Sequence, residues 1–88
     1  MKKYNLKSLE VQVLSDDSYV VEFLTLDGGK AVVDLDFNDI GDVSYVDVEK
    51  QKQTDQVDAF YDELNTRFGI LDFLKQLGAK FIQKDKKW

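Results

Sequence analysis

The side chains in this chain that could carry chemistry are almost all carboxylates. Its 88 residues include 17 aspartates and glutamates but no histidine and no cysteine. Nucleophilic catalysis by Ser-His or Cys-His pairs needs an imidazole base, so both are excluded, as are disulfides. Zinc sites are built mainly from cysteine and histidine. We therefore expect no catalytic residue, no cofactor and no metal, and a protein that is not an enzyme.

The closest match to a metal site is a segment spaced like a calcium loop. Counting from Asp36, an asparagine stands at position 3 (Asn38), a glycine at position 6 (Gly41) and a carboxylate at position 12 (Asp47). However, Ile40 stands where an oxygen ligand is needed, and Asp47 replaces the usual bidentate glutamate. Strand patterns rather than helix patterns flank the segment, so we interpret it as a polar turn.

Two other patterns also have simpler explanations. The Gly28-Gly29-Lys30 sequence lacks the full spacing of a phosphate-binding loop, and no helix pattern follows it. Asp34 and Asp36 are neighbours on one strand, whereas the two carboxylates of a glycosidase flank a cleft. We interpret the first pattern as a hairpin turn and the second as a solvated strand face.

The elements that would position these side chains form a small antiparallel sheet. Apolar and polar residues alternate from Leu9 to Val13, which is the pattern of a half-buried strand. The stretch from Tyr19 to Phe37 contains two β-rich runs joined by a Gly-Gly turn, a strong hairpin signal. A fourth strand follows at 43–49 with ambiguous facing, and 50–53 is a polar linker. The sequence predicts a four-stranded β-meander over 9–49.

Only hairpin loops of odd length keep one face of this sheet apolar. We predict a three-residue loop at 16–18, and a three- or five-residue loop around Gly28 and Gly29 with a glycine in the left-handed conformation. A two-residue Gly28-Gly29 turn would contradict the prediction. The predicted pairs are Val13 with Val21, Val11 with Phe23, Leu35 with Phe23, and Phe37 with Val21.

The second half of the chain has a helical pattern over 54–77. Thr54 is a suitable N-cap, and apolar residues recur at helical spacing from Val57 onwards. Gly69 suits a helix end, so the sequence leaves open one helix or two. Residues 79–84 are compatible with a short fifth strand. The expected fold is therefore a single α+β domain over 1–88: an antiparallel four-stranded β-meander with one or two C-terminal helices packed on one face. The predicted core consists of Leu9, Val11, Val13, Val21, Phe23, Val33, Leu35, Phe37, Phe60, Leu64, Phe68, Leu71 and Leu74.

The face of the sheet opposite this core mixes acidic and apolar residues. It carries the candidate partner-binding residues Glu22, Leu24, Val32, Asp34 and Asp36, with Glu10, Gln12, Leu14 and Val20 beside them. Such an uncovered face suits a basic protein partner. The function favoured is therefore a small non-enzymatic interaction module.

Four other interpretations remain open for this face. It could mimic nucleic acid, as inhibitors encoded by mobile elements do, or form a homodimer sheet to sheet. A carboxylate-based metal binder or enzyme is less favoured, and an ordinary solvated sheet face is the simplest alternative. The net charge is −5, with lysines gathered near both ends, so the acidic body should repel phosphates and not bind nucleic acid directly. Without a long apolar run or a signal-peptide pattern, we expect a cytoplasmic protein with no membrane contact.

Overall fold

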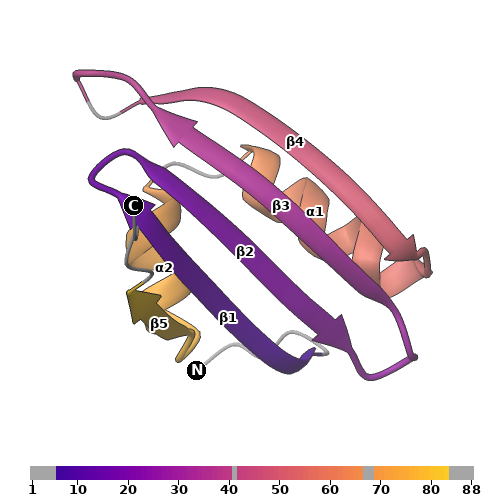
Figure 1. Ribbon diagram of the computed structural model, residues 1–88. Coiled ribbons are helices and arrows are strands. Elements are labelled where there is room, and N and C mark those ends of the chain that lie inside the picture. The colour runs from indigo at the N-terminus through magenta and orange to yellow at the C-terminus, as the bar shows by residue number, and fades with distance from the viewer. Residues whose placement is uncertain (1–5, 41, 67–68, 84–88) are drawn as a thin grey trace, which may run out of the picture.

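The computed structural model describes residues 6–40, 42–66 and 69–83, which form one five-stranded sheet and two helices (Figure 1). The elements follow the chain in this order: β1 (Leu6–Ser15), β2 (Ser18–Thr25), β3 (Lys30–Phe37), β4 (Val43–Lys52), α1 (Asp55–Thr66), α2 (Ile70–Gln76) and β5 (Lys80–Gln83). The sheet order is β4-β3-β2-β1-β5, antiparallel except that β5 runs parallel to β1. The predicted α+β fold, with its four-stranded meander, is confirmed.

The β1–β2 hairpin has the predicted face parity but not the predicted loop. Val11 lies opposite Val21, which keeps odd-numbered residues together on one face. The connection itself is only two residues, 16–17, and a register shift between Val13 and Ser15 adds the extra residue that restores the parity. The predicted pairing of Val13 with Val21 is therefore wrong by two residues.

The β2–β3 hairpin has the predicted odd loop with a left-handed glycine. The Thr25 N–H donates to the Gly29 carbonyl at 2.9 Å, and the Gly28 N–H donates to the Thr25 carbonyl at 3.2 Å. These bonds enclose the three residues 26–28, with Gly28 at φ 90°. The loop is centred on Asp27 rather than on the glycines. As a result Phe23 lies opposite Ala31, and its predicted pairing with Leu35 is wrong.

The register of β4 resolves its ambiguous facing. Val46 lies opposite Leu35 and Val48 opposite Val33, so even-numbered residues of β4 face the core. Both valines pack against the core, whereas Tyr45 is 53% exposed. The strand also continues to Lys52, so most of the segment predicted as a polar linker is part of the sheet.

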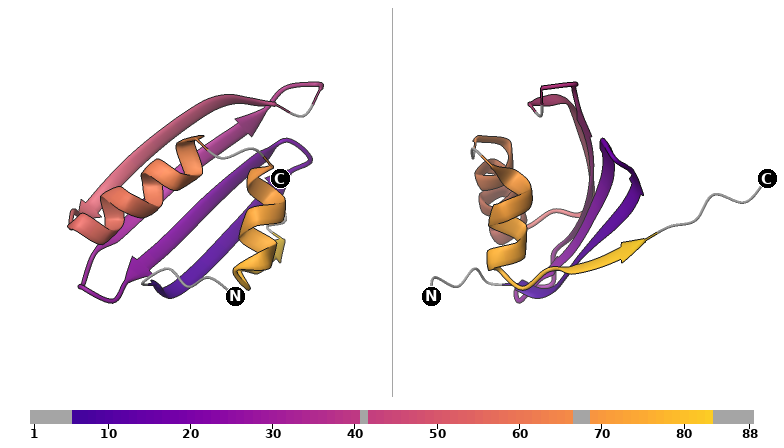
Figure 2. Two further views of the ribbon diagram at one scale, coloured as in Figure 1. Left: turned by 180° about the vertical axis from the view of Figure 1, so that it is seen from behind. Right: turned by 90° about the vertical axis from the view of Figure 1, so that its left-hand side faces the viewer.

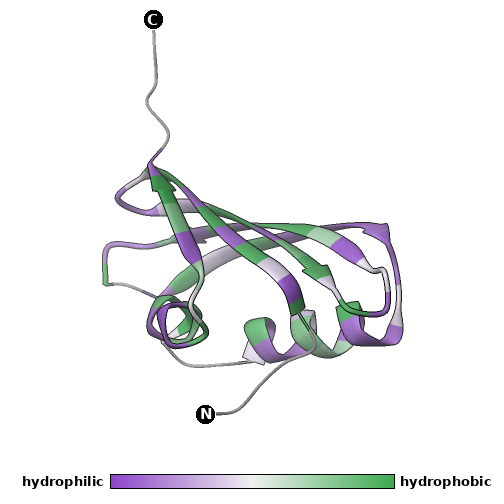
Figure 3. Ribbon diagram, turned by 90° about the horizontal axis from the view of Figure 1, so that it is seen from below, coloured by the Kyte–Doolittle hydropathy of each residue, from purple (hydrophilic) through white to green (hydrophobic). Residues whose placement is uncertain are grey.

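The helical segment is divided into two helices, and both lie against the same face of the sheet (Figure 2). α1 buries Val57, Phe60 and Leu64, and α2 buries Ile70, Phe73 and Leu74. Hydrophobic and hydrophilic residues alternate along the strands above them (Figure 3). The chain then returns to the sheet as the short strand β5, beside β1.

The core between sheet and helices contains most of the residues predicted for it. The predicted residues that are buried are Val11, Val21, Phe23, Val33, Leu35, Phe60, Leu64 and Leu74, while Leu9, Phe37 and Leu71 are partly buried against them. Val13 is half-buried outside this cluster, and Phe68 lies outside the described residues. Ile70 and Phe73 were absent from the prediction. Phe60 of α1 contacts both β2 and α2: the centre of its ring lies 4.7 Å from the ring centre of Phe23 and 6.2 Å from that of Phe73.

Candidate interaction surface

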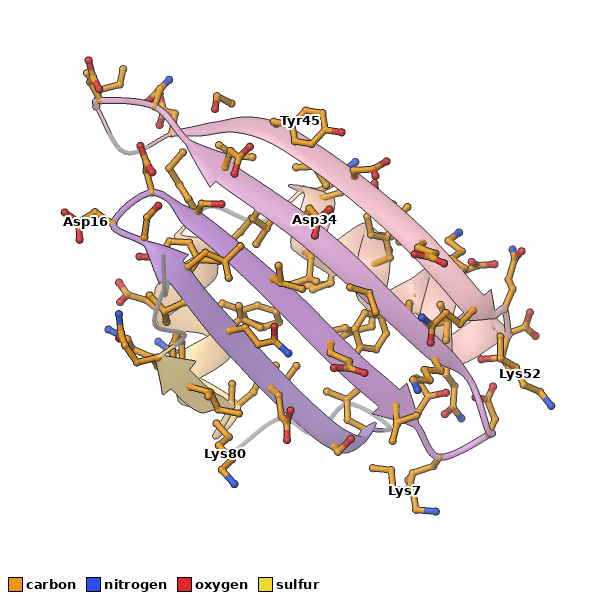
Figure 4. The ribbon with its side chains drawn as sticks, viewed as in Figure 1. Lys7, Asp16, Asp34, Tyr45, Lys52 and Lys80 are labelled. Carbon is orange, nitrogen blue, oxygen red and sulfur yellow. The ribbon has the colours of Figure 1, made fainter. Side chains whose placement is uncertain are left out.

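The sheet has one face that no described helix or strand covers, because both helices lie on the other side (Figures 1 and 2). We call this uncovered side the outer face. The cross-strand registers place the following residues on it: Glu10, Gln12, Val20, Glu22, Leu24, Lys30, Val32, Asp34, Asp36, Tyr45, Asp47, Glu49, Lys80 and Ile82. In Figure 4, Asp34 lies over the middle of β3, whereas Lys52 and Lys80 lie at opposite edges of the sheet. The outer face is therefore acidic at its centre.

Two pairs of carboxylates lie directly opposite one another on neighbouring strands of the outer face. Glu10 pairs with Glu22 across β1 and β2, and Asp34 pairs with Asp47 across β3 and β4. Like charges in this position repel and destabilise a sheet.

The two pairs differ in how their charge is compensated. Lys80 on β5 lies opposite Glu10, and the Lys30 ammonium is 3.9 Å from the Glu22 carboxylate. Neither Asp34 nor Asp47 has a hydrogen bond or ion pair through its carboxylate within the residues that the structure describes. The negative charge without a partner is therefore concentrated on β3 and β4.

All five predicted binding residues lie on this outer face, on β2 and β3. Glu22 is opposite Val32, and Leu24 is opposite Lys30. Leu24 and Val32 are half-buried. The prediction missed Tyr45, Asp47 and Glu49 of β4, because that strand has valines at both odd and even positions and its facing was left open.

A hydrogen-bonded cluster fixes α1 to the covered side of the sheet. Asp27, in the β2–β3 loop, accepts hydrogen bonds from the Thr25 hydroxyl at 2.5 Å and the Thr54 hydroxyl at 2.8 Å. Thr54 also accepts from the Val57 N–H at 3.2 Å, which is the predicted N-cap contact. The hydrogen bond from Thr25, with those from Thr54 and the backbone, holds the pKa of Asp27 below its ordinary value.

A second contact fixes the end of β4 to the same helix. The Lys50 ammonium lies 2.7 Å from Asp58 of α1, and the Gln53 side chain donates to the same carboxylate at 3.0 Å. The Lys50 ammonium also lies 5.5 Å from the centre of the Tyr61 ring. The hydrogen bonds from Lys50 and Gln53 lower the pKa of Asp58. Both contacts hold α1 under the sheet, on the side away from the outer face.

The segment that resembles a calcium loop forms a hydrogen-bonded turn. The Asn38 side-chain oxygen accepts from the Ile40 N–H at 3.1 Å and from the Asp42 N–H at 2.9 Å. Asp47, which would be the twelfth-position ligand, lies in β4 opposite Asp34. In the described part of the chain, no three or more acidic residues are grouped so that they could hold a metal ion.

An open groove of about 1130 Å³ lies at one end of the sheet, between the β1–β2 and β3–β4 turns and the start of α2. Tyr19 and Phe37 line it with their rings 5.6 Å apart, edge to face, and Tyr45 also contributes. Every charged residue that the structure describes in its lining is an aspartate: Asp16, Asp17, Asp39, Asp42 and Asp72. The acidic surface therefore extends beyond the outer face.

No protein-family model, curated protein or solved structure matches this chain. Among the described residues, no helix has the length and apolar character needed to cross a membrane.

Proposed function

We propose that this protein is a small non-enzymatic binding module that holds a basic protein partner against its outer face. The observation that carries the proposal is the pair of carboxylates Asp34 and Asp47, which lie directly opposite each other and form no ion pair with any described residue. A like-charge cross-strand pair costs about 0.2–1 kcal/mol in the free protein. A lysine or arginine from a partner would turn this repulsion into attraction.

The apolar residues of the outer face supply the second part of an interface. Val20, Leu24, Val32 and Ile82 are half-buried among the carboxylates. Apolar contact at the centre of an interface provides affinity, while complementary charge accelerates association and selects the partner. The partner surface that fits is therefore basic with apolar residues between its charges.

The same charges argue against a homodimer formed outer face to outer face. Two copies would bring two identical acidic faces together, each carrying the Asp34–Asp47 pair and the Glu10–Glu22 pair. Opposed like charges weaken association most when water is excluded. A partner of opposite charge is the better fit.

Nucleic-acid mimicry is a second candidate, and it rests on the spacing of the carboxylates. Pairs on neighbouring strands are separated by about 4.8 Å, the distance between strands, so the face presents negative charge at short, regular intervals. A partner that normally binds nucleic acid would then compete for the same face. Adding duplex DNA or RNA, and in parallel heparin at equal charge, to a preformed complex separates the two candidates. Any polyanion competes for a basic partner, but only the partner of a mimic should be displaced more readily by nucleic acid than by heparin.

The test uses two double variants with the same change in net charge. Asp34→Lys with Asp47→Lys reverses the charge of this pair and brings the net charge of the outer-face residues named above from −4 to 0. The pair stays mutually repulsive, so stability should change little. Asp55→Lys with Asp62→Lys reverses two exposed carboxylates of α1 instead. Immobilised wild type and variants are incubated with cell lysate, and bound proteins are eluted with increasing salt.

We expect basic proteins that elute with salt to bind the wild type and the α1 variant but not the outer-face variant. If both variants bind these proteins as well as the wild type does, the interaction lies elsewhere. Binding lost equally from both would show that only net charge matters. Either result would overturn the proposal.

A further inference from the structure

The two edges of the sheet differ in how well they are protected against an added strand. β5 closes one edge with four residues and carries Lys80. β4 forms the other edge with ten residues, and no described segment pairs with its free side. Register shifts lie near both of its ends, and Lys50 and Lys52 lie near its C-terminal end, so its regular, lysine-free part is 45–49. Natural sheets usually shorten, bend or cover such an edge, since it is a template for strand addition.

The hydrogen-bonding pattern identifies the free backbone groups of β4. The Phe37 N–H donates to the backbone carbonyl of Asp17, on the side of β2. The Asn38 N–H donates to the backbone carbonyl of Asp42, on the side of β4. Alternation along β3 therefore directs its even residues towards β4, where they bond Tyr45, Asp47 and Glu49. The N–H and C=O groups of the residues between them, Val46, Val48 and Lys50, point to the free edge.

The side chains of β4 prescribe what a strand added there would carry. Val46 and Val48 face the helices and are only half-buried, so apolar residues beside them would complete their burial. Asp47 and Glu49 face outwards and are exposed. Basic residues beside them would lie about 4.8 Å away, one strand spacing, and would supply the missing counter-charge of the Asp34–Asp47 pair.

A second copy of β4 is a poor occupant of this edge. Two β4 strands paired antiparallel around Val48 would set Asp47 of each copy opposite Glu49 of the other, and like charges directly opposite are unfavourable. In this register the edge disfavours a second copy of itself, and a strand of opposite charge fits better.

We propose that an extended segment of the basic partner joins the sheet along β4 as an additional strand. Its basic side chains lie on the outer face beside Asp47 and Glu49, and its apolar side chains lie beside Val46 and Val48. This inference rests on the proposed function and adds the mode of binding: backbone hydrogen bonds to β4 give affinity, and alternating side chains give specificity.

The test uses a capped synthetic peptide of alternating lysine and valine, long enough to span β4, with binding measured by calorimetry. Two modified peptides are compared with it, one N-methylated at every valine and the other at every lysine. In an antiparallel added strand, the valines opposite Val46 and Val48 donate the hydrogen bonds to β4, whereas the lysine N–H groups face solvent. Parallel addition reverses these roles.

We expect one methylated peptide to bind at least about tenfold more weakly than the other, because it alone loses its hydrogen bonds to β4. Loss with methylated valines indicates antiparallel addition, and loss with methylated lysines indicates parallel addition. Hydrogen exchange followed by NMR provides a second readout. The unmodified peptide should slow exchange at Val46, Val48 and Lys50 and leave Tyr45 and Asp47 unchanged.

The outcomes separate this inference from the proposed function. If both methylated peptides bind alike, or the peptide does not bind, strand addition is wrong. If both methylated peptides bind alike, a basic partner can still use the outer face, provided that the Asp34→Lys, Asp47→Lys variant binds the unmodified peptide more weakly than the wild type does. If that variant binds the unmodified peptide as well as the wild type does, the acidic face has no role and both proposals fail.

Discussion

Replacing Gly29 by alanine should strongly destabilise the protein for steric reasons. Gly29 lies directly beside the first turn of α1, and an added Cβ would overlap the Val57 side chain and the Thr54 hydroxyl. It would also lie 2.6 Å from the Thr25 hydroxyl oxygen. Gly29 is not among the residues with positive φ, so any residue could adopt its backbone conformation. Its requirement for glycine comes entirely from the close approach of the helix.

The magnitude follows from the two ways of relieving this overlap. Forcing an extra carbon into a packed site costs about 1–3 kcal/mol. If α1 moves away instead, the N-cap contact between Thr54 and Val57 is lost, which costs about 1 kcal/mol. Whichever response is cheaper sets the cost, so we expect Gly29→Ala to lower the free energy of unfolding by about 1–3 kcal/mol. A domain of this size has about 4–13 kcal/mol in total, so the loss is a substantial fraction.

The neighbouring glycine is the matched control, because it is required for a different reason. Gly28 has φ 90°, and an added Cβ would meet no atom within 4 Å. Gly28→Ala should cost about 1–2 kcal/mol through backbone strain alone, and Gly28→Asn less, since asparagine tolerates the left-handed region. Gly29→Asn should be at least as damaging as Gly29→Ala. Urea unfolding followed by circular dichroism gives all four values. If asparagine is tolerated equally at both positions, the steric explanation is wrong.

Three further predictions can be checked by unfolding experiments. Phe23→Ala should cost about 3–5 kcal/mol, because the side chain is fully buried, and an unchanged melting temperature would contradict this. The folded state holds the pKa of Asp27 below its ordinary value of 3.8. The resulting stability is complete above pH 3.8 and is lost as pH falls through the lower folded pKa, so Asp27→Asn should weaken the acid dependence of the melting temperature below about pH 4. Asp34→Asn should raise stability by about 0.2–1 kcal/mol at low salt by relieving repulsion from Asp47; a gain that persists unchanged at 1 M salt would refute that cause.

The fold could be predicted to the level of strands, faces and helices, because each depends on local periodicity. The alternation around Phe23 and Val33 allowed only a hairpin that keeps odd residues together, and the loop of 26–28 satisfies this. The register itself was not predictable. At the centre of the loop, Asp27 accepts a local hydrogen bond from Thr25 and one from Thr54, which is 27 residues further along the chain. No local pattern contains that contact.

The candidate surface was predictable only where a strand alternates cleanly. Asp34 and Asp36 stand between apolar residues on β3, so their facing follows from sequence. β4 has apolar residues at both parities, and its outward carboxylates Asp47 and Glu49 became identifiable only through the pairing of β4 with β3. The opposed pair Asp34–Asp47, on which the functional proposal rests, is a property of that register.

The distribution of lysines gives the two like-charge pairs different roles. The Glu10–Glu22 pair has Lys80 opposite Glu10 on β5, and the Lys30 ammonium lies 3.9 Å from the Glu22 carboxylate, so two lysines lie near it. The Asp34–Asp47 pair adjoins the only long free edge among the described strands, and no lysine of the described residues lies opposite it or forms an ion pair with it. If the acidic residues served only to keep the protein soluble, we would not expect the described lysines to lie beside the Glu10–Glu22 pair but not beside the pair next to the free edge of β4. Uncompensated charge and unpaired backbone groups coincide on β4, and a single basic strand would satisfy both.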